Sequence, residues 1–338
     1  MSGFPPFVAH AQALVFGEET PVLAPRIASV QTISGTGACH VGARFLTDTL
    51  GAKRVWFPDP TWGNHHLIWT MAAGHVEQKL HPYYNPKTRS LDFEGMMATL
   101  RAEGQKGDII VLHACAHNPT GLDPTKEQWQ QIADVCEDKG IFPFFDSAYQ
   151  GFASGDLDRD AWAIRHFASR GLEIAVAQSF SKNFGLYGQR VGAFHLLLSK
   201  PEAQPNTLSQ IVRVIRGEIS VCPLYGARVV AAILSDKQLR NEWLDDLRTM
   251  SERLKEMRQA LYSELQKRGT PGTWEHIVDQ IGMFSYTGLN AEQARILRDD
   301  HHIYMMKTGR ASIAGLNTTN VESVGAAIDA VVRAAGSS

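Results

Sequence analysis

Short, nearly uninterrupted apolar runs constrain the fold of this 338-residue chain most strongly. Parallel strands are buried on both faces of a sheet, so their sequences are apolar almost throughout rather than alternating. Longer helical segments separate the runs, for example residues 126–140, where apolar residues recur at helical spacing and Gly140 provides a stop signal. We therefore predict an α/β fold with a mostly parallel central sheet and flanking helices. The predicted strands are RVWFPD (54–59), DIIVLHA (108–114), IFPFFD (141–146), EIAVAQSF (173–180) and VGAFHLLL (191–198).

A different pattern begins in the last third of the chain. Apolar residues recur there every three or four positions, which predicts one long amphipathic helix over residues 237–268. Strand-like runs follow at 281–289 and 302–309, and a final helix is expected at 321–335. This alternation predicts a second, smaller α+β unit. The predicted domains are a large one (1–247) and a small C-terminal one (248–338), joined by the long helix.

Composition excludes several classes of protein. Hydrophobic residues make up 44% and charged residues 20% of the chain, and the net charge is −2, so no basic excess indicates nucleic acid or an anionic membrane as a partner. No apolar stretch approaches the ~20 residues needed to cross a bilayer. The N-terminus lacks the basic region of a signal peptide, so we expect a cytoplasmic protein that acts on small molecules. The cysteines form no C-x-x-C pair, which predicts neither a metal site nor a disulfide framework; they are Cys39, Cys115, Cys136 and Cys222.

Polar side chains follow three of the predicted strands, at the carboxyl ends where ligands bind in open parallel sheets. Asn118 in AHNPTG follows one strand, and Asp146 and Tyr149 in FFDSAY follow a second. Ser179, Ser181 and Lys182 in SFSK follow a third. Each has a simple structural explanation, because Asn-Pro-x-Gly is a common turn, an aspartate can cap a helix and most lysines are solvated. Together they would place an amide, a carboxylate, a phenol and an amine at one crevice.

Lys182 is the most informative of these residues. It lies between a strand and the largely apolar stretch 184–186, where desolvation would lower the pKa of its amine and make it nucleophilic. Such an amine forms Schiff bases, and a buried carboxylate such as Asp146 would keep the ring nitrogen of pyridoxal phosphate (PLP) protonated. The phosphate of PLP would need backbone N–H groups and a cation. SGTGA (34–38) at the start of a helix would provide the first, and Arg190 the second.

Six motifs along the chain resemble those of one enzyme family. They occur in the order and approximate spacing of aspartate aminotransferases of the eukaryotic type, from residue 4 almost to the C-terminus. The resemblance implies a PLP-dependent fold type I enzyme that works as a homodimer with shared active sites. It also implies transfer of the amino group of L-aspartate to 2-oxoglutarate, which gives oxaloacetate and L-glutamate. The motifs are SGTGA, DPTWGNH, HACAHNPTG, DSAYQGFASG, SFSKNFGLYGQRVG and GRASIAGL.

The resemblance implies cofactor roles for individual residues. Lys182 would form the Schiff base with PLP and then move a proton between the substrate's Cα and the cofactor. Asp146 would bind the pyridine nitrogen, with His65 supporting it from behind. Tyr149 and Asn118 would hydrogen-bond the cofactor's 3-oxygen. The implied phosphate cup comprises Ser34, Gly35, Thr36, Ser179 and Arg190.

The resemblance implies substrate contacts as well. Trp62 would stack on the cofactor ring and, with Asn118, contact the substrate. Arg310 would hold the α-carboxylate, and Arg216 would reach across the dimer to the distal carboxylate, with Arg228 as a weaker candidate for that role. Bidentate arginine pairing suits planar carboxylates, which favours dicarboxylic acids as substrates.

Two departures from the family leave other functions open. The family carries several dozen residues before the point where this chain begins, including an arm that embraces the partner subunit and a tyrosine that reaches the partner's cofactor. This chain also has SVCP (220–223) where the family usually has Ser-Asn-Pro-Pro. One alternative is a catalytically weak or inactive homologue that serves as a binding or dimerisation partner. The other is a PLP enzyme of another type, such as a β-lyase or an aminotransferase of aromatic amino acids.

Overall fold

The central sheet of the computed structural model, which describes residues 1–336, has seven strands in the order β1-β9-β8-β7-β6-β2-β3. β9 runs antiparallel to both of its neighbours, and the other strand pairs of the sheet are parallel. The prediction of a mostly parallel α/β sheet is therefore confirmed. The strands are β1 (Ile27–Ile33), β2 (Arg54–Asp59), β3 (Glu77–Pro82), β6 (Ile109–His113), β7 (Phe142–Ser147), β8 (Ile174–Ser179) and β9 (Val191–Leu197).

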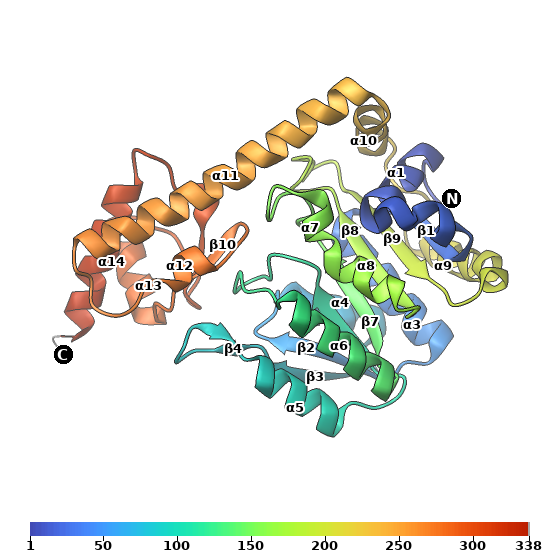
Figure 1. Ribbon diagram of the computed structural model, residues 1–338, viewed down its shortest axis with the longest axis horizontal. Helices are drawn as coiled ribbons and strands as arrows, with labels where there is room; N and C mark the ends of the chain where they lie inside the picture. Colours follow the sequence, from blue (N-terminus) through green and yellow to red (C-terminus); the bar gives the residue numbers. More distant parts are fainter. Residues whose placement is uncertain (337–338) are drawn as a thin grey trace.

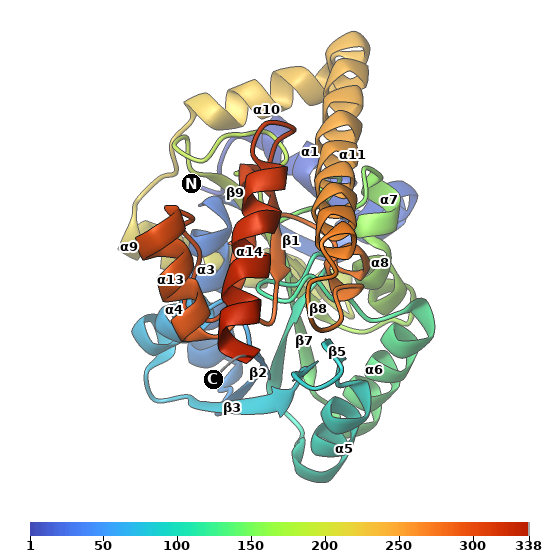
Figure 2. The ribbon, with the colours of Figure 1, turned by 90° about the vertical axis from the view of Figure 1, so that its left-hand side faces the viewer.

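Helices cover both faces of this sheet, which explains the apolar runs. Figure 2 shows α3 (Ser34–Leu50), α4 (Asn64–Ala73) and α9 (Gln204–Glu218) on one side of the strands. It shows α5 (Phe93–Glu103), α6 (Lys126–Lys139) and α8 (Trp162–Ser169) on the other side. Neighbouring residues of one strand therefore enter different cores: Val176 packs with α6 and α8, whereas Ala175 and Ala177 pack with α3.

The five predicted strands correspond to β2 and β6 to β9, and each observed end lies within one residue of the predicted one. β1 and β3 were not predicted. β1 has the sequence IASVQTI, in which buried polar residues interrupt the apolar pattern. β3 has the sequence EQKLHP and lies at the edge of the sheet, where polar side chains reach solvent.

Local signals set the ends of the helices. Thr125 and Gln128 form a reciprocal capping box at the start of α6, and Gly140 ends that helix with a left-handed φ of 64°. The predicted helix at 126–140 is thus confirmed. The other α-helices of the first 235 residues are α1 (Pro5–Phe16), α2 (Thr20–Leu23), α7 (Leu157–Asp160) and α10 (Tyr225–Ser235), and β4 (Tyr84–Asn85) and β5 (Ser90–Leu91) form a hairpin.

The long helix α11 (Lys237–Lys267) confirms the predicted amphipathic helix. The carboxylate of Asp236 caps it by accepting from the N–H groups of Gln238 and Leu239. Figure 1 shows α11 running from α10, beside the sheet, to α14 at the other end of the molecule. The indole of Trp243 donates to the Asn183 carbonyl at 2.8 Å, which ties the start of α11 to the loop after β8.

The C-terminal part of the chain is built on α11 and a two-stranded sheet. β10 (Phe284–Tyr286) pairs antiparallel with β11 (Arg310–Ser312), and α12 (His276–Asp279), α13 (Ala291–His301) and α14 (Val321–Gly336) complete it. One cluster of buried apolar residues extends from Phe7 to Val331, so the two ends of the described chain share a core. The division into domains at residue 247 stays a prediction.

The predicted strand at 302–309 is wrong, because the strand begins only at Arg310. Residues 302–306 have no regular structure, although their side chains alternate between core and solvent. Ile303 and Met305 pack against the apolar cluster, whereas Tyr304 and Met306 are exposed. Alternating burial imitates a strand here, but the segment pairs with no other strand among the described residues.

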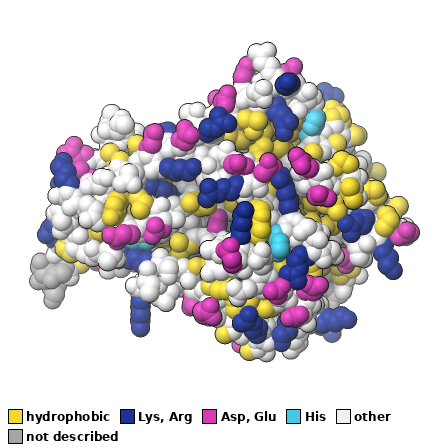
Figure 3. All heavy atoms as spheres, in the orientation of Figure 1, with side chains coloured by type: hydrophobic (Ala, Val, Ile, Leu, Met, Phe, Trp, Pro, Cys, Tyr) yellow, Lys and Arg dark blue, Asp and Glu magenta, His cyan; other side chains and the backbone are white. Residues whose placement is uncertain are grey.

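The surface agrees with the small net charge. On the face shown in Figure 3, basic and acidic side chains are interspersed rather than gathered into one basic patch. Within residues 1–336, no helix combines the length and apolar character that crossing a membrane requires.

Candidate active site

A cavity of about 290 Å³ lies at the carboxyl ends of the parallel strands. Its position follows from the topology, because β6, β7 and β8 run parallel and end at the same edge of the sheet. The cavity gathers most of the side chains that the sequence predicts for the site: Ser34, Gly35, Thr36, Trp62, Asn118, Asp146, Tyr149, Ser179, Lys182, Arg190 and Arg310.

Lys182 projects into this cavity from the loop that follows β8. Its Nζ atom lies 4.9 Å from the centre of the Tyr149 ring. Burial lowers the pKa of Lys182, and the charge of Arg190 lowers it further, while Asp146 opposes the shift. The Asn183 side chain donates to the Gln150 carbonyl at 3.1 Å and fixes the loop. The prediction of a desolvated amine at this position is thus supported by the geometry.

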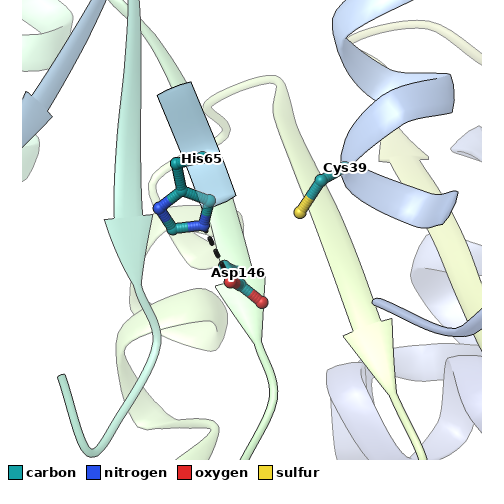
Figure 4. A group of neighbouring side chains, drawn as sticks. All are labelled: Cys39, His65 and Asp146. Carbon is teal, nitrogen blue, oxygen red and sulfur yellow. Dashed lines mark hydrogen bonds and ion pairs between the residues drawn. The ribbon is translucent and has the colours of Figure 1, made fainter. Parts of the chain in front are cut away.

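Asp146 lies at the end of β7 and accepts a hydrogen bond from His65 Nε2 at 2.9 Å (Figure 4). Burial opposes ionisation of this carboxyl. The hydrogen bond from His65 is the largest effect that favours ionisation and the charge of Lys182 adds a smaller one, so the pKa of Asp146 lies below its ordinary value. The structure therefore keeps a carboxylate ready to bind a cationic nitrogen, and His65 lies where the resemblance implies.

A directional chain of hydrogen bonds supports His65. The Asn118 N–H donates to His113 Nδ1 at 3.4 Å, and burial lowers the pKa of His113 well below its ordinary value. The neutral ring therefore carries its proton on Nε2 and donates to Thr61 Oγ1 at 3.1 Å. Thr61 then donates to His65 Nδ1 at 2.9 Å, which leaves the proton of His65 on Nε2, facing Asp146.

Cys39 on α3 points toward the same carboxylate (Figure 4). Its Sγ atom and one ligand atom each of His65 and Asp146 lie within 4.8 Å of one another. Burial raises the pKa of Cys39 well above its ordinary value, and the Asp146 charge adds to this effect. We interpret Cys39 as a neutral thiol that covers Asp146, because His65 and Asp146 already satisfy each other.

The start of α3 forms a cradle with the ends of β8 and β9. The Ser34 hydroxyl lies 2.7 Å from Ser181 Oγ and 3.2 Å from Ser179 Oγ. A Cβ atom on Gly35 would lie 2.9 Å from Ser179 Cβ, so only glycine lets the helix come this close. The N–H groups of the first helical turn and the hydroxyls therefore converge, together with Arg190, on one wall of the cavity. These groups suit a phosphate.

Arg310 also lines the cavity, and its Nη1 donates to Asn118 Oδ1 at 2.9 Å. The Arg310 guanidinium also lies 4.3 Å from the ring centre of Phe284. Trp62 lines the cavity with its ring edge-on to His65, at 5.2 Å between centroids. Burial, and next the Asp146 charge, raise the pKa of Tyr149, so its phenol stays a hydrogen-bond donor.

Besides His65, which contacts Asp146 without lining the cavity, two predicted residues lie outside it. Arg216 is exposed in the last turn of α9, where its Nη1 donates to Ser220 Oγ at 2.6 Å. Arg228 is exposed on α10 and lies over the ring of Phe4, at 6.0 Å from its centre. Neither arginine lines the cavity of its own chain.

The cavity also contains residues to which the sequence analysis assigned no role. Tyr187 is one of them, although the motif that contains Lys182 also contains Tyr187. Met283 and Phe284 come from the distant β10 region, which no local motif linked to the site. Ser181 is one of the polar strand-end residues expected at the crevice; the residues without an expected place there are His113, Cys115, Ala148, Tyr187, Met283 and Phe284.

Comparison with known proteins identifies the family. The family model for aminotransferase class I and II matches residues 4–328. The chain is 47% identical over 333 residues to an L-tyrosine:2-oxoglutarate aminotransferase of Aspergillus ustus, covering 96% of this chain and 63% of that protein. It is 46% identical over 331 residues to aspartate aminotransferase 1 of Medicago sativa, covering 98% of this chain and 78% of that protein.

A solved structure gives the same result for the fold. The chain matches an aromatic-amino-acid aminotransferase of Burkholderia pseudomallei, covalently bound to pyridoxal phosphate, with a TM-score of 0.95 and 40% identity. The match covers 98% of this chain and 82% of that one. Both the sequence and the fold therefore agree over nearly the whole chain, and the chain belongs to the class I and II aminotransferases.

Proposed function

We propose that the chain is an aspartate aminotransferase, which transfers the amino group of L-aspartate to 2-oxoglutarate and yields oxaloacetate and L-glutamate. The observation that carries the proposal is one cavity that holds Lys182, Asp146 and Arg310 together. Relatives from rice, yeast and chicken named aspartate aminotransferases, at 45–46% identity, support the choice of substrate. The chain spans about two thirds to four fifths of the relatives' lengths.

The residues of the cavity fit PLP as the cofactor. The cradle of Ser34, Gly35 and Ser179 offers hydroxyl and backbone donors for a phosphate, and Asp146 offers a carboxylate for a pyridine nitrogen. When bound, PLP withdraws electrons from the amino acid's Cα and makes its proton easier to remove. Trp62 would lie against the cofactor ring, and Tyr149 and Asn118 would hydrogen-bond its 3-oxygen.

Lys182 would carry out the proton transfer. Because burial lowers the pKa of Lys182, a larger fraction of its amine is neutral than for a solvated lysine. The neutral Lys182 amine would hold PLP covalently, and the same Nζ, once free, would remove the proton from the substrate's Cα.

Arg310 would hold the α-carboxylate of the substrate by paired hydrogen bonds. The exposed Arg216 lies outside the cavity of its own chain, so it can reach a distal carboxylate only in a second copy. We therefore propose a homodimer with shared active sites. A second, apolar cavity of about 630 Å³ supports the homodimer. It is next to the first cavity, because Thr36 and Arg190 line both. The exposed Leu67 and Met71 line it too, and exposed apolar side chains of this kind suit contact with a second copy.

Mixed dimers test this arrangement directly. Lys182→Ala chains alone should be inactive, and Arg216→Asp chains alone should have little activity at aspartate concentrations near the wild-type KM. When they are co-expressed, a mixed dimer contains one site that has both Lys182 and Arg216 intact, so activity should return. Absence of any recovery in dimers confirmed by light scattering would overturn the shared site, and a monomeric wild-type protein would overturn the homodimer.

A tyrosine aminotransferase is the second candidate, because a relative at 47% identity carries that name. The visible spectrum of the PLP-loaded protein separates the candidates, since transfer of an amino group to the cofactor changes its absorption. Aspartate should convert the spectrum at much lower concentration than tyrosine. The reverse preference would favour the aromatic substrate, and no change with either would favour an inactive binding partner.

The cytoplasm is our proposed compartment. Relatives from rice and yeast are named as cytoplasmic enzymes, whereas one from Dictyostelium discoideum is named as mitochondrial. Fractionation of the source cells with an antibody against this chain tests the proposal, and recovery in an organelle fraction would contradict it.

A further inference from the structure

Arg258 is a buried cation outside the active cavity. It lies on α11 with 2% of its surface exposed, and no carboxylate of residues 1–336 forms an ion pair with it. Burial lowers the pKa of Arg258 to about 10, so the guanidinium stays charged at neutral pH. A buried charge without a counter-ion is costly unless hydrogen bonds satisfy it.

Backbone carbonyls of one short segment accept from both terminal nitrogens of Arg258, whereas its Nε has no hydrogen-bond partner within residues 1–336. Nη1 of Arg258 donates to the Ile277 carbonyl at 2.9 Å. Nη2 donates to the carbonyls of Gly282 at 3.0 Å and Phe284 at 2.5 Å. These carbonyls come from both ends of residues 277–284, which lead from α12 into β10. The guanidinium therefore holds the segment in one shape.

This segment forms part of the wall of the active cavity. Met283 and Phe284 line the cavity, and the Ile281 N–H donates to the Gly121 carbonyl at 2.8 Å. A Cβ atom on Gly282 would lie 2.5 Å from Ala116 Cβ, which shows how closely the segment packs against the loop after β6. Movement of the segment would therefore change the cavity itself.

Phe284 connects Arg258 to Arg310. The backbone carbonyl of Phe284 accepts from Arg258, and the ring of Phe284 lies 4.3 Å from the Arg310 guanidinium. The guanidinium of Arg310 also donates to Asn118 Oδ1 at 2.9 Å. One of these two contacts thus depends on where Arg258 holds the Phe284 backbone.

We propose that Arg258 is a positioning residue for carboxylate binding, which acts on Arg310 through Phe284. The inference rests on the proposed function, because it assigns the substrate carboxylate to Arg310. Arg258 donates to none of the residues expected to hold PLP, so the affinity for PLP should not depend on it. A small displacement of a carboxylate-binding arginine can cost on the order of 100-fold in rate.

The test measures binding of glutarate, a dicarboxylate with no group that can react, to the PLP-loaded protein by calorimetry. Arg258→Met should weaken glutarate binding on the order of 10- to 100-fold, while the dissociation constant of PLP stays unchanged. Arg258→Lys keeps the charge with fewer fixed donors, so it should show a smaller loss.

Arg253→Met is the matched control. Arg253 lies on the same helix and also donates to a backbone carbonyl, that of Leu316 at 2.6 Å, but it does not contact the cavity wall. Its replacement should leave glutarate binding unchanged. Equal losses in the two methionine variants would overturn the inference, because the effect would then belong to anchoring of α11 in general.

A double-mutant cycle keeps the proposal testable if Arg258→Met does not fold. If Arg258 acts through Phe284, the effects of Arg258→Lys and Phe284→Leu on glutarate binding should not add. Full additivity, or unchanged glutarate affinity in a folded Arg258 variant, would overturn the inference. A wild-type protein that binds neither PLP nor glutarate would instead overturn the proposed function.

Discussion

Replacement of His65 by leucine tests how the site keeps Asp146 ionised. The His65 imidazole is fully buried and donates to the Asp146 carboxylate at 2.9 Å. Leucine fills most of the same space but leaves the buried carboxylate without its donor. Burial then dominates, so the pKa of Asp146 should rise. The cofactor's pyridine nitrogen would lose part of its anionic partner.

The hydrogen bond sets the magnitude of this loss. A hydrogen bond to a charged group contributes about 1.5–3 kcal/mol, which corresponds to about 10- to 150-fold in affinity. We expect PLP to bind His65→Leu more weakly by this factor. Because the raised pKa of Asp146 makes the carboxyl protonate as pH falls, the loss relative to wild type should be larger at about pH 6 than at about pH 8.5.

The assay is a titration of the cofactor-free protein with PLP at both pH values, followed by tryptophan fluorescence. His65→Gln, which keeps an N–H donor, is the matched control and should retain more affinity than His65→Leu. Wild-type affinity for His65→Leu at both pH values, in a protein with native circular dichroism, would refute the reasoning.

Three further predictions follow from single contacts. Lys182→Ala should prevent borohydride from fixing PLP to the peptide that contains residue 182, as detected by mass spectrometry; a labelled peptide would contradict the assignment. Arg216→Asp should raise KM for aspartate on the order of 100-fold with little change in KM for tyrosine. If steady-state kinetics give the variant the same KM for aspartate as the wild type, Arg216 does not belong to the substrate site. Gly192→Ala would place a Cβ atom 2.4 Å from the Ser34 backbone and should weaken binding of PLP and of inorganic phosphate, which titration of each ligand would show; unchanged affinities would contradict the proposed phosphate cup.

The positions of residues on local motifs could be predicted from the sequence. The strand-end pattern predicted that Asn118, Asp146 and Lys182 would meet, because parallel strands end at one edge of the sheet. Trp62 follows the predicted strand at 54–59, but its role, like that of Arg310, is implied only by the family resemblance. Their presence in the same cavity agrees with that resemblance.

Long-range contacts explain what the sequence could not predict. Phe284 reaches the cavity because β10 pairs with β11 and because Arg258 holds its carbonyl, and neither contact leaves a periodic pattern. The prediction of a strand at 302–309 is wrong for the opposite reason. Its side chains alternate in burial, but a strand also needs a hydrogen-bonded partner, and only residues 310–312 have one.

Backbone strain at the proposed phosphate cup is consistent with a preformed site. Ser34 has φ 64° and Arg190 has φ 51°, a left-handed conformation that costs a non-glycine residue about 1–3 kcal/mol. The structure retains both because Gly192 packs directly against the Ser34 backbone and because the Arg190 side chain donates to the Tyr187 carbonyl at 3.0 Å. The free-energy cost of this backbone strain therefore arises during folding. An anion that enters the cup need not reorganise the backbone, so its binding free energy is reduced less by the cost of ordering the cup.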